Sequence, residues 1–121
     1  MPKYWLFYHF TWSTKNRLPL IDDDNRVILY KSIISKSVEL GASVLAINGM
    51  DDHMHLLVSV SPTVSPSILI GQIKGVSSHL VRRSGWKEFK WQKEYAIKAV
   101  TESQLPIVIL YIQNQQKHHP K

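Results

Sequence analysis

The stretch Gly49–Val60, GMDDHMHLLVSV, joins a turn to a strand and thereby decides how the rest of the chain folds. Asp51 and Asp52 are typical turn residues, and the residues that follow them are mostly aliphatic, as in a buried strand. The preceding segment Ala42–Asn48, ASVLAIN, has the same aliphatic character. Two short strands separated by a turn predict an antiparallel β-hairpin.

One helix is predicted on each side of this hairpin. Residues 22–41, DDDNRVILYKSIISKSVELG, begin with acidic N-cap candidates and end at a glycine, and Ser65 followed by Pro66 marks the start of a second helix. Apolar residues at helical spacing predict the buried face of each helix. They are Val27, Tyr30, Ile34 and Val38 in the first helix and Leu69, Ile73, Val76 and Leu80 in the second.

Two further strands and a terminal helix complete the pattern. Residues 3–14, KYWLFYHFTWST, and residues 91–101, WQKEYAIKAVT, are predicted strands, and residues 103–117, SQLPIVILYIQNQQK, are a predicted helix. The order βαββαβ with an added C-terminal helix predicts an α+β fold of the ferredoxin-like, split βαβ type, with one four-stranded antiparallel sheet. This architecture hosts many functions, so the function has to be inferred from side chains.

Length, charge and cysteine content limit the class of protein. The 121 residues, 44% of them hydrophobic, predict a single domain over residues 1–121 with one substantial core. The 15 lysines and arginines against 9 acidic residues give a net charge of +6, which favours an anionic partner. The absence of cysteine excludes disulfides and thiolate metal sites. With no apolar run of about 18 residues, we expect a cytoplasmic protein with no membrane partner.

The two histidines of the quoted stretch share one face of their predicted strand. Side chains alternate across a sheet. Met54, Leu56, Val58 and Val60 are therefore expected to face the helices, and His53, His55, Leu57 and Ser59 to face the other way. Two imidazoles at this spacing can converge on one metal ion. For an isolated His-x-His tripeptide the plainer interpretation is favoured, in which one histidine caps the hairpin and the other is an ordinary surface group.

The terminal helix offers chemical partners for these histidines. At about 100° per residue, Tyr111 and Gln115 lie roughly 40° apart, beside an apolar stripe. The stripe consists of Leu105, Val108, Ile109 and Ile112. Tyr111 also fits an amphipathic border position with its hydroxyl in water, and Gln115 then fits ordinary helix surface. His9, in the first strand, is interpreted as a packed strand residue.

Together these residues resemble the single-tyrosine HUH transposases of the insertion-sequence-200-like (TnpA-type) group, with the related REP-associated tyrosine transposases. The HUH motif, two histidines around a hydrophobic residue, corresponds to His53-Met54-His55. The family's helix with a nucleophilic tyrosine and a metal-binding glutamine four residues later corresponds to "YIQNQ", Tyr111 to Gln115. The segments YHFTWSTKNR, HLLVSV, IKGVSSHLVRR and WQKEYAIKAV are also similar, so the resemblance spans nearly the whole chain.

The resemblance implies a transposase that acts on single-stranded DNA with hairpin ends. It implies that Tyr111 attacks a phosphodiester and forms a covalent 5′-phosphotyrosine, which makes the protein a metal-dependent single-strand endonuclease and strand transferase. His53, His55 and Gln115 are the implied ligands of Mg²⁺ or Mn²⁺. A homodimer is expected, because cutting and rejoining two ends needs two tyrosines.

Further residues are candidates for supporting roles. Basic residues beside the aromatic Trp86 and Trp91 suit unpaired nucleic acid. The candidates for nucleic-acid binding are Lys15, Arg17, Lys74, Arg82, Arg83 and Lys87. Asp52 is a candidate to orient the imidazole of the adjacent His53 by accepting a hydrogen bond from it, although a turn-forming role explains Asp52 equally well.

Two other functions remain open at this point. One is a domesticated or inactive relative that still binds hairpin DNA. The other is a non-catalytic RNA-binding module of the same fold that uses the open sheet face.

Overall fold

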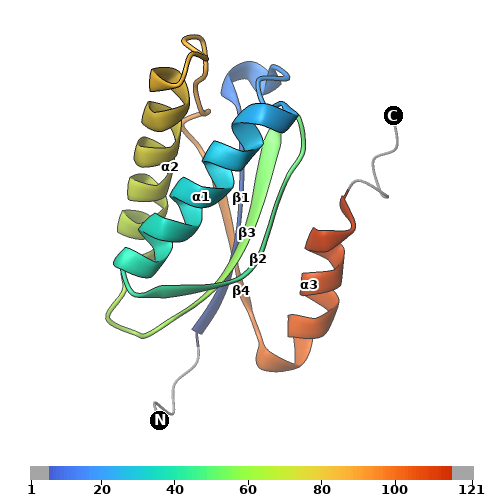
Figure 1. Ribbon diagram of the computed structural model, residues 1–121. Coiled ribbons are helices and arrows are strands. Elements are labelled where there is room, and N and C mark those ends of the chain that lie inside the picture. Colours follow the sequence, from blue (N-terminus) through green and yellow to red (C-terminus); the bar gives the residue numbers. More distant parts are fainter. Residues whose placement is uncertain (1–5, 116–121) are drawn as a thin grey trace.

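The structure, a computed structural model, describes residues 6–115 as a four-stranded sheet with helices on both faces (Figure 1). The strands are β1 (Leu6–Ser13), β2 (Ala42–Gly49), β3 (His53–Val60) and β4 (Ala96–Val100). The helices are α1 (Asp23–Glu39), α2 (Pro66–Arg83) and α3 (Leu105–Gln113), with short 3₁₀ turns η1 (Lys15–Arg17) and η2 (Glu102–Gln104). The expected order βαββαβ with an added C-terminal helix is confirmed.

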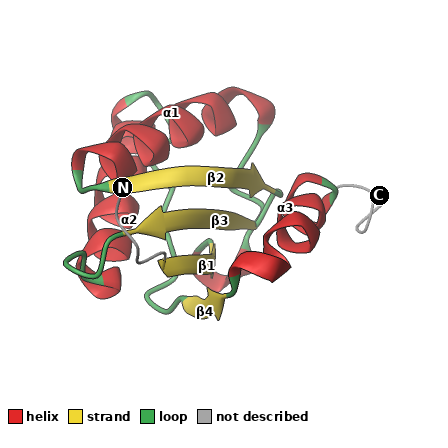
Figure 2. Cartoon of the chain, turned by 90° about the horizontal axis from the view of Figure 1, so that it is seen from below, coloured by secondary structure: helices red, strands yellow, loops and turns green. Residues whose placement is uncertain are grey.

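The sheet is open and antiparallel, with strand order β2-β3-β1-β4. Helices α1 and α2 cover one face, and α3 lies against the other face over β2 and β3 (Figure 2). This is the α+β, ferredoxin-like arrangement that the sequence predicts. Because α3 covers only part of its face, the side chains of β1 and β4 on that face lie beside the helix.

Strand β3 contributes to both cores of the described chain. Met54 and Leu56 belong to the main core under α1 and α2, whereas Leu57 belongs to a smaller cluster with Ala46 and Ile112 under α3. The predicted alternation of β3 is therefore confirmed. The same alternation places His53 and His55 on the α3 face.

The predicted buried faces of α1 and α2 are partly wrong. Val27, Ile34 and Val38 are exposed, and α1 instead buries Leu29 and Ile33. In α2, Leu69 and Ile73 are buried as expected and Val76 is partly buried, but Leu80 is exposed; Ile70 and Val81 are buried in addition.

The cause is a set of buried serines, Ser32, Ser37, Ser77 and Ser78, whose hydroxyls donate to carbonyls of their own helices. Such serines occupy positions that a purely apolar pattern assigns to the surface.

The predicted helix starts are confirmed. The Asp22 carboxylate accepts from the backbone N–H of Asn25, whose side chain accepts in return from the Asp22 N–H, forming a capping box at α1. At α2 the Ser65 hydroxyl accepts from the N–H of Ile68. Both caps satisfy donors that an isolated helix leaves without partners.

Strand β4 is shorter than predicted, because the segment before it leaves the sheet. Trp91 makes only an isolated bridge to Thr14, and pairing with β1 begins at Ala96. The ammonium of Lys74 on α2 donates to the carbonyls of Gln92 and Lys93, while the backbone N–H of Gln92 donates to the carbonyl of Ser13 at the end of β1. Positions 3–5 of the first predicted strand and 116–117 of the terminal helix lie outside the described residues. No described helix has the length and apolarity needed to cross a membrane.

Candidate active site

The two histidines of β3 project side by side from the α3 face of the sheet. Their ring centroids are 5.1 Å apart and the ring planes are nearly perpendicular. His55 is only 5% exposed, and both rings line an open cavity of about 450 Å³. The cavity also contains Arg17, Tyr111 and Gln115, so the structure brings together residues from β3, η1 and the terminal helix.

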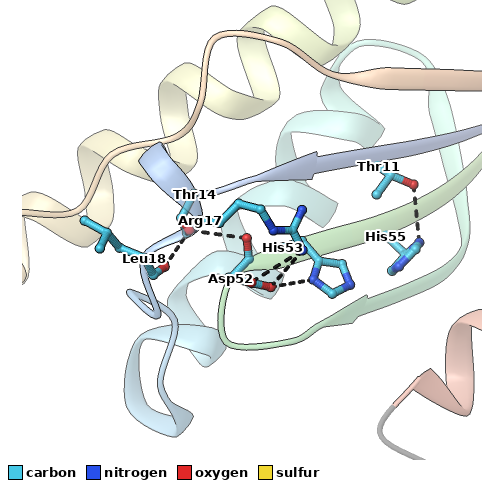
Figure 3. A network of polar contacts seen from close by, with 7 residues as sticks. All are labelled: Thr11, Thr14, Arg17, Leu18, Asp52, His53 and His55. Atoms are coloured by element: carbon cyan, nitrogen blue, oxygen red, sulfur yellow. Dashed lines mark hydrogen bonds and ion pairs between the residues drawn. The ribbon is translucent and has the colours of Figure 1, made fainter. Parts of the chain in front are cut away.

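A carboxylate from the hairpin turn holds His53. Oδ1 of Asp52 lies 2.7 Å from Nδ1 of His53, and Nη2 of Arg17 lies 3.4 Å from both carboxylate oxygens of Asp52 (Figure 3). The turn itself is fixed, because the backbone N–H and the hydroxyl of Thr14 both donate to the Asp52 carbonyl. Asp52 therefore contacts both His53 and the guanidinium of Arg17.

Two side chains of the neighbouring strand β1 hold His55. Nδ1 of His55 is 3.0 Å from Nε2 of His9 and 3.3 Å from Oγ1 of Thr11. Burial, and secondarily the positive charge of Lys98, lower the pKa of His9 below its ordinary value. Both contacts engage Nδ1 of His55, so a metal ion at this site would bind His55 through Nε2.

Tyr111 reaches the histidines from α3. Its ring stands edge-on to His55, with centroids 5.7 Å apart at 90°, and its ring centroid is 6.4 Å from that of His9. The side chain is 45% exposed, so a large substrate can approach it. The next residue, Ile112, is fully buried in the cluster under α3, and its carbonyl accepts a 2.8 Å hydrogen bond from Nδ2 of Asn48 on β2.

Gln115 lies one turn beyond Tyr111, as the helical spacing predicts. Its side chain is 1% exposed, and its Nε2 donates to the carbonyl of Tyr111 at 3.1 Å. This amide lines the same cavity as the two imidazoles, and its carbonyl oxygen is a suitable ligand. Within residues 6–115 no three histidines and acidic residues cluster as a metal site. Two imidazoles and one amide oxygen nevertheless fit a divalent cation that completes its coordination with water and phosphate oxygens.

The predicted basic contacts fall into separate groups. Arg17 lines the cavity, and Lys15 is exposed in the same turn. Both Asn16 and Arg17 adopt positive φ angles, of 55° and 53°, in the left-handed region that non-glycine residues seldom occupy. The η1 turn is thus a constrained loop, held by the N–H of Asn16 donating to Oε1 of Gln92 and by the N–H of Lys15 donating to the carbonyl of Lys90.

The other basic candidates lie at α2 and beyond it. The Lys74 ammonium donates to the carbonyls of Gln92, Lys93 and Glu94, and burial lowers its pKa. Arg82 donates to the carbonyl of Phe89, while Arg83 and Lys87 are exposed. The structure does not bring any of these four side chains into the cavity of the histidines. Trp91 is buried in the main core, and Nε1 of Trp86 donates to Asp22, so both tryptophans have structural contacts.

Sequence reasoning missed three side chains that contact the site. His9 is not only a packed strand residue, since it contacts His55; Thr11 also contacts His55, and Asn48 holds the helix of Tyr111. In the observed register, Thr11 and Asn48 are both paired with His55 across the strands. The signal that could find them is this register, which requires knowing which strands are neighbours.

A tyrosine on a helix beside a histidine pair, on an open antiparallel sheet, agrees with the class of DNA-cleaving transposases that the sequence motifs resemble. The chain belongs to the IS200-like transposase family, whose model matches residues 3–115. It is therefore a transposase, a DNA-recombination enzyme of the kind that insertion sequences encode.

Individual relatives agree with this assignment. The chain is 25% identical to the ISDra2 transposase TnpA of Deinococcus radiodurans over 93% of this chain and 85% of that protein. A crystal structure of a transposase from Deinococcus radiodurans R1 superposes with a TM-score of 0.77 at 25% identity, covering 94% of this chain and 93% of the other. The structure of a REP-associated tyrosine transposase bound to a REP hairpin matches with the same TM-score at 19% identity, covering 99% and 73%, and shows a common fold.

Proposed function

We propose that this transposase cleaves and rejoins single-stranded DNA through a covalent 5′-phosphotyrosine at Tyr111. The observation that carries the proposal is the edge-on contact of Tyr111 with His55, in a cavity that also contains His53, Arg17 and Gln115. A nucleophile, two imidazoles, an amide and a guanidinium in one open cavity match the needs of phosphodiester cleavage.

The bond changes balance without an external energy source. The phenolic oxygen of Tyr111 forms a bond to phosphorus while the bond from phosphorus to the 3′-oxygen of the preceding nucleotide breaks. The phenolic proton goes to solvent, and the departing 3′-oxygen takes up a proton to become a hydroxyl. Because the new phosphodiester retains the bond energy, attack by a 3′-hydroxyl reverses the reaction and joins strands.

The chain's own residues position the phosphate for this step. His53, held by Asp52, and His55, held by His9, would bind Mg²⁺ or Mn²⁺ together with Gln115. A bound divalent cation supplies neutralisation of the phosphate charge. Arg17 lines the same cavity, and its guanidinium can donate to a phosphate oxygen.

The proposed substrate is single-stranded DNA with hairpin ends. Support comes from the net charge of +6 and from the hairpin bound by the structurally similar REP-associated transposase. Exposed basic residues outside the cavity, Lys15, Arg82, Arg83 and Lys87, are the proposed contacts for the hairpin backbone. We further propose a homodimer, because joining two ends needs two tyrosines.

A covalent-adduct assay tests this proposal. The protein is incubated with single-stranded oligonucleotides from the flanks of its own gene and with Mn²⁺ or Mg²⁺, and the products are separated on a denaturing gel. We expect an adduct that Tyr111→Phe abolishes while DNA binding persists, and that His55→Ala reduces strongly. Tyr8→Phe is the matched control, because Tyr8 packs against the main core on the opposite face of the sheet.

Two outcomes contradict the proposal. An adduct that persists in Tyr111→Phe identifies another nucleophile. Binding of hairpin DNA by the wild-type protein without any adduct identifies a relative that binds and does not cleave.

A further inference from the structure

A second cavity opens beside the histidines, between α3 and the exposed half of the sheet. Its volume is about 700 Å³. Lys98 and Val100 of β4 and His9 of β1 line it, together with Ile107 and Val108 of α3. We call it the β4–α3 groove. It exists because α3 covers β2 and β3 and leaves the corresponding side chains of β1 and β4 accessible.

The β4–α3 groove and the cavity of the histidines are continuous. Four residues line both of them, namely Thr11, His55, Ala96 and Tyr111. The nucleophile and one histidine thus stand at the junction of two open spaces. A chain that is cleaved at Tyr111 must extend in both directions from the reacting phosphate, and the two spaces provide one path on each side.

The chemistry of the groove fits an unpaired nucleotide. Ile107 is 73% exposed and Val108 is partly buried, so the α3 side offers an apolar surface to a flat base. The groove floor carries Lys98, which pairs with His9 across the strands and is close enough to influence its pKa. No carboxylate within residues 6–115 forms an ion pair with Lys98, in contrast to the engaged ammonium of Lys74. An apolar wall beside a cation suits a base and its phosphate, because grooves for single strands combine positive charge with side chains against which the bases pack.

We propose that the β4–α3 groove binds one unpaired nucleotide of the DNA strand directly adjacent to the phosphate cleaved at Tyr111. Lys98 contacts a phosphate of that strand, and Ile107 packs against the base. This inference rests on the proposed function and extends it to a site for the flanking nucleotide. The occupant is single-stranded DNA, because the groove is continuous with the site of the nucleophile and carries positive charge.

The test measures DNA binding without cleavage. In the Tyr111→Phe background, Lys98→Met and Ile107→Ala are compared with Lys31→Met and Val38→Ala, matched changes at exposed positions of α1 on the far side of the sheet. We expect Lys98→Met to weaken binding about fivefold at moderate salt and to reduce the slope of log K against log salt by about 0.7, the value for one phosphate of a single strand. Lys31→Met should change neither quantity.

Fluorescence locates the nucleotide. 2-Aminopurine is placed at each of the two positions that flank the phosphate mapped by the adduct assay. We expect the emission at one of these positions to change on binding, because contact with a side chain alters the emission of 2-aminopurine. Ile107→Ala should reduce this change, and Val38→Ala should leave it as it is.

Several results overturn the inference. They are a Lys98→Met variant that binds like Lys31→Met, an emission that changes at neither position, and groove variants that alter oligomeric mass instead of DNA binding. An adduct formed at Tyr111 together with any of these results leaves the proposed function standing and removes only the groove assignment. Absence of an adduct from the wild-type protein overturns the proposed function and, with it, the placement of the groove beside a cleaved phosphate.

Discussion

The side-chain amide of Asn48 donates a 2.8 Å hydrogen bond to the carbonyl of Ile112, the residue that follows Tyr111. The other end of the amide accepts from the hydroxyl of Tyr30 at 3.1 Å, and that hydroxyl accepts from the N–H of Gly49 at 2.8 Å. One connected set of hydrogen bonds thus joins α1, β2 and α3. It fixes the last turn of the tyrosine helix to the sheet of its own chain.

We predict that Asn48→Ala loosens this helix and slows cleavage. One net hydrogen bond contributes about 0.5–1.5 kcal/mol, which corresponds to a rate reduction of up to about tenfold if the docked helix is the reactive form. Single-turnover adduct formation and amide hydrogen exchange of α3 measure the two effects. Gln72→Ala, at an exposed position of α2, is the control. Unchanged exchange in α3 would show that Asn48 does not hold the helix.

His9→Phe is expected to weaken metal binding by about 10- to 100-fold, the usual effect of removing a partner that orients a ligating histidine. The phenyl ring preserves the packing but cannot form the hydrogen bond with Nδ1 of His55. Titration of the protein with Mn²⁺, followed by the electron paramagnetic resonance of the free ion, measures the affinity. His79→Phe is the control, since His79 is exposed on α2. Equal affinities in the two variants would exclude an orienting role for His9.

Asp52→Ala should lower metal affinity by a similar factor through the other histidine. Its carboxylate contacts Nδ1 of His53 and also pairs with Arg17, so its removal frees both side chains. Asp51→Ala is the neighbouring control, because the structure uses the carbonyl of Asp51, which accepts from the N–H of Ile21. Equal Mn²⁺ affinities of the two variants would show that Asp52 stabilises the hairpin turn and does not orient His53.

Lys74→Met is predicted to affect stability rather than DNA binding. The ammonium donates to the carbonyls of Gln92, Lys93 and Glu94, and loss of these charged hydrogen bonds should reduce the free energy of unfolding by about 1–3 kcal/mol. Urea denaturation measures this change. The salt dependence of DNA binding should remain that of the wild type. A slope lowered by about 0.7 would instead assign Lys74 to a DNA phosphate.

The cap of α1 predicts a pH-dependent stability difference. The backbone N–H of Asn25, aided by Trp86, lowers the pKa of Asp22 below its ordinary value of 3.8. The folded state therefore favours the carboxylate, whose contribution is complete well above the unfolded-state pKa and is lost as the pH falls through the folded-state pKa. Asp22→Ala should cost about 1 kcal/mol of unfolding free energy at pH 7.

The difference in unfolding free energy between Asp22→Ala and the wild type should shrink below a pH of about 4. Denaturation at several pH values measures this difference. Asp24→Ala, an exposed change in the first turn of the same helix, should have a smaller effect at pH 7. If this difference in unfolding free energy did not change with pH, the effect of Asp22 would come from packing and not from its charge.

Short-range periodicity predicted much of the fold and the main residues of the candidate site. The alternation of β3 placed His53 and His55 on the face opposite the main core, and the angle between Tyr111 and Gln115 placed both beside the buried Ile112. These relationships depend only on the geometry of one strand or one helix. Such geometry is contained in the sequence itself.

The rest depends on contacts between distant segments. His9 and His55 meet because β1 and β3 are neighbours in a particular register, which periodicity does not specify. The ammonium of Lys74 binds the loop that begins at Gln92. From the sequence alone, its positive charge was equally compatible with the predicted contact to nucleic acid. The buried face of α1 was predicted wrongly because Ser37 satisfies its hydroxyl within the helix and can therefore enter the core.

The alternation of β3 also links the folding of the protein to its chemistry. A shift of one residue in the pairing of this strand would turn both imidazoles toward the main core and Met54 toward the face that α3 partly covers. A misregistered strand would therefore lose core packing and the histidine pair at the same moment. The register that packs the main core is therefore also the register that points the two imidazoles toward the tyrosine. Selection for a stable fold consequently selects for a correctly assembled site.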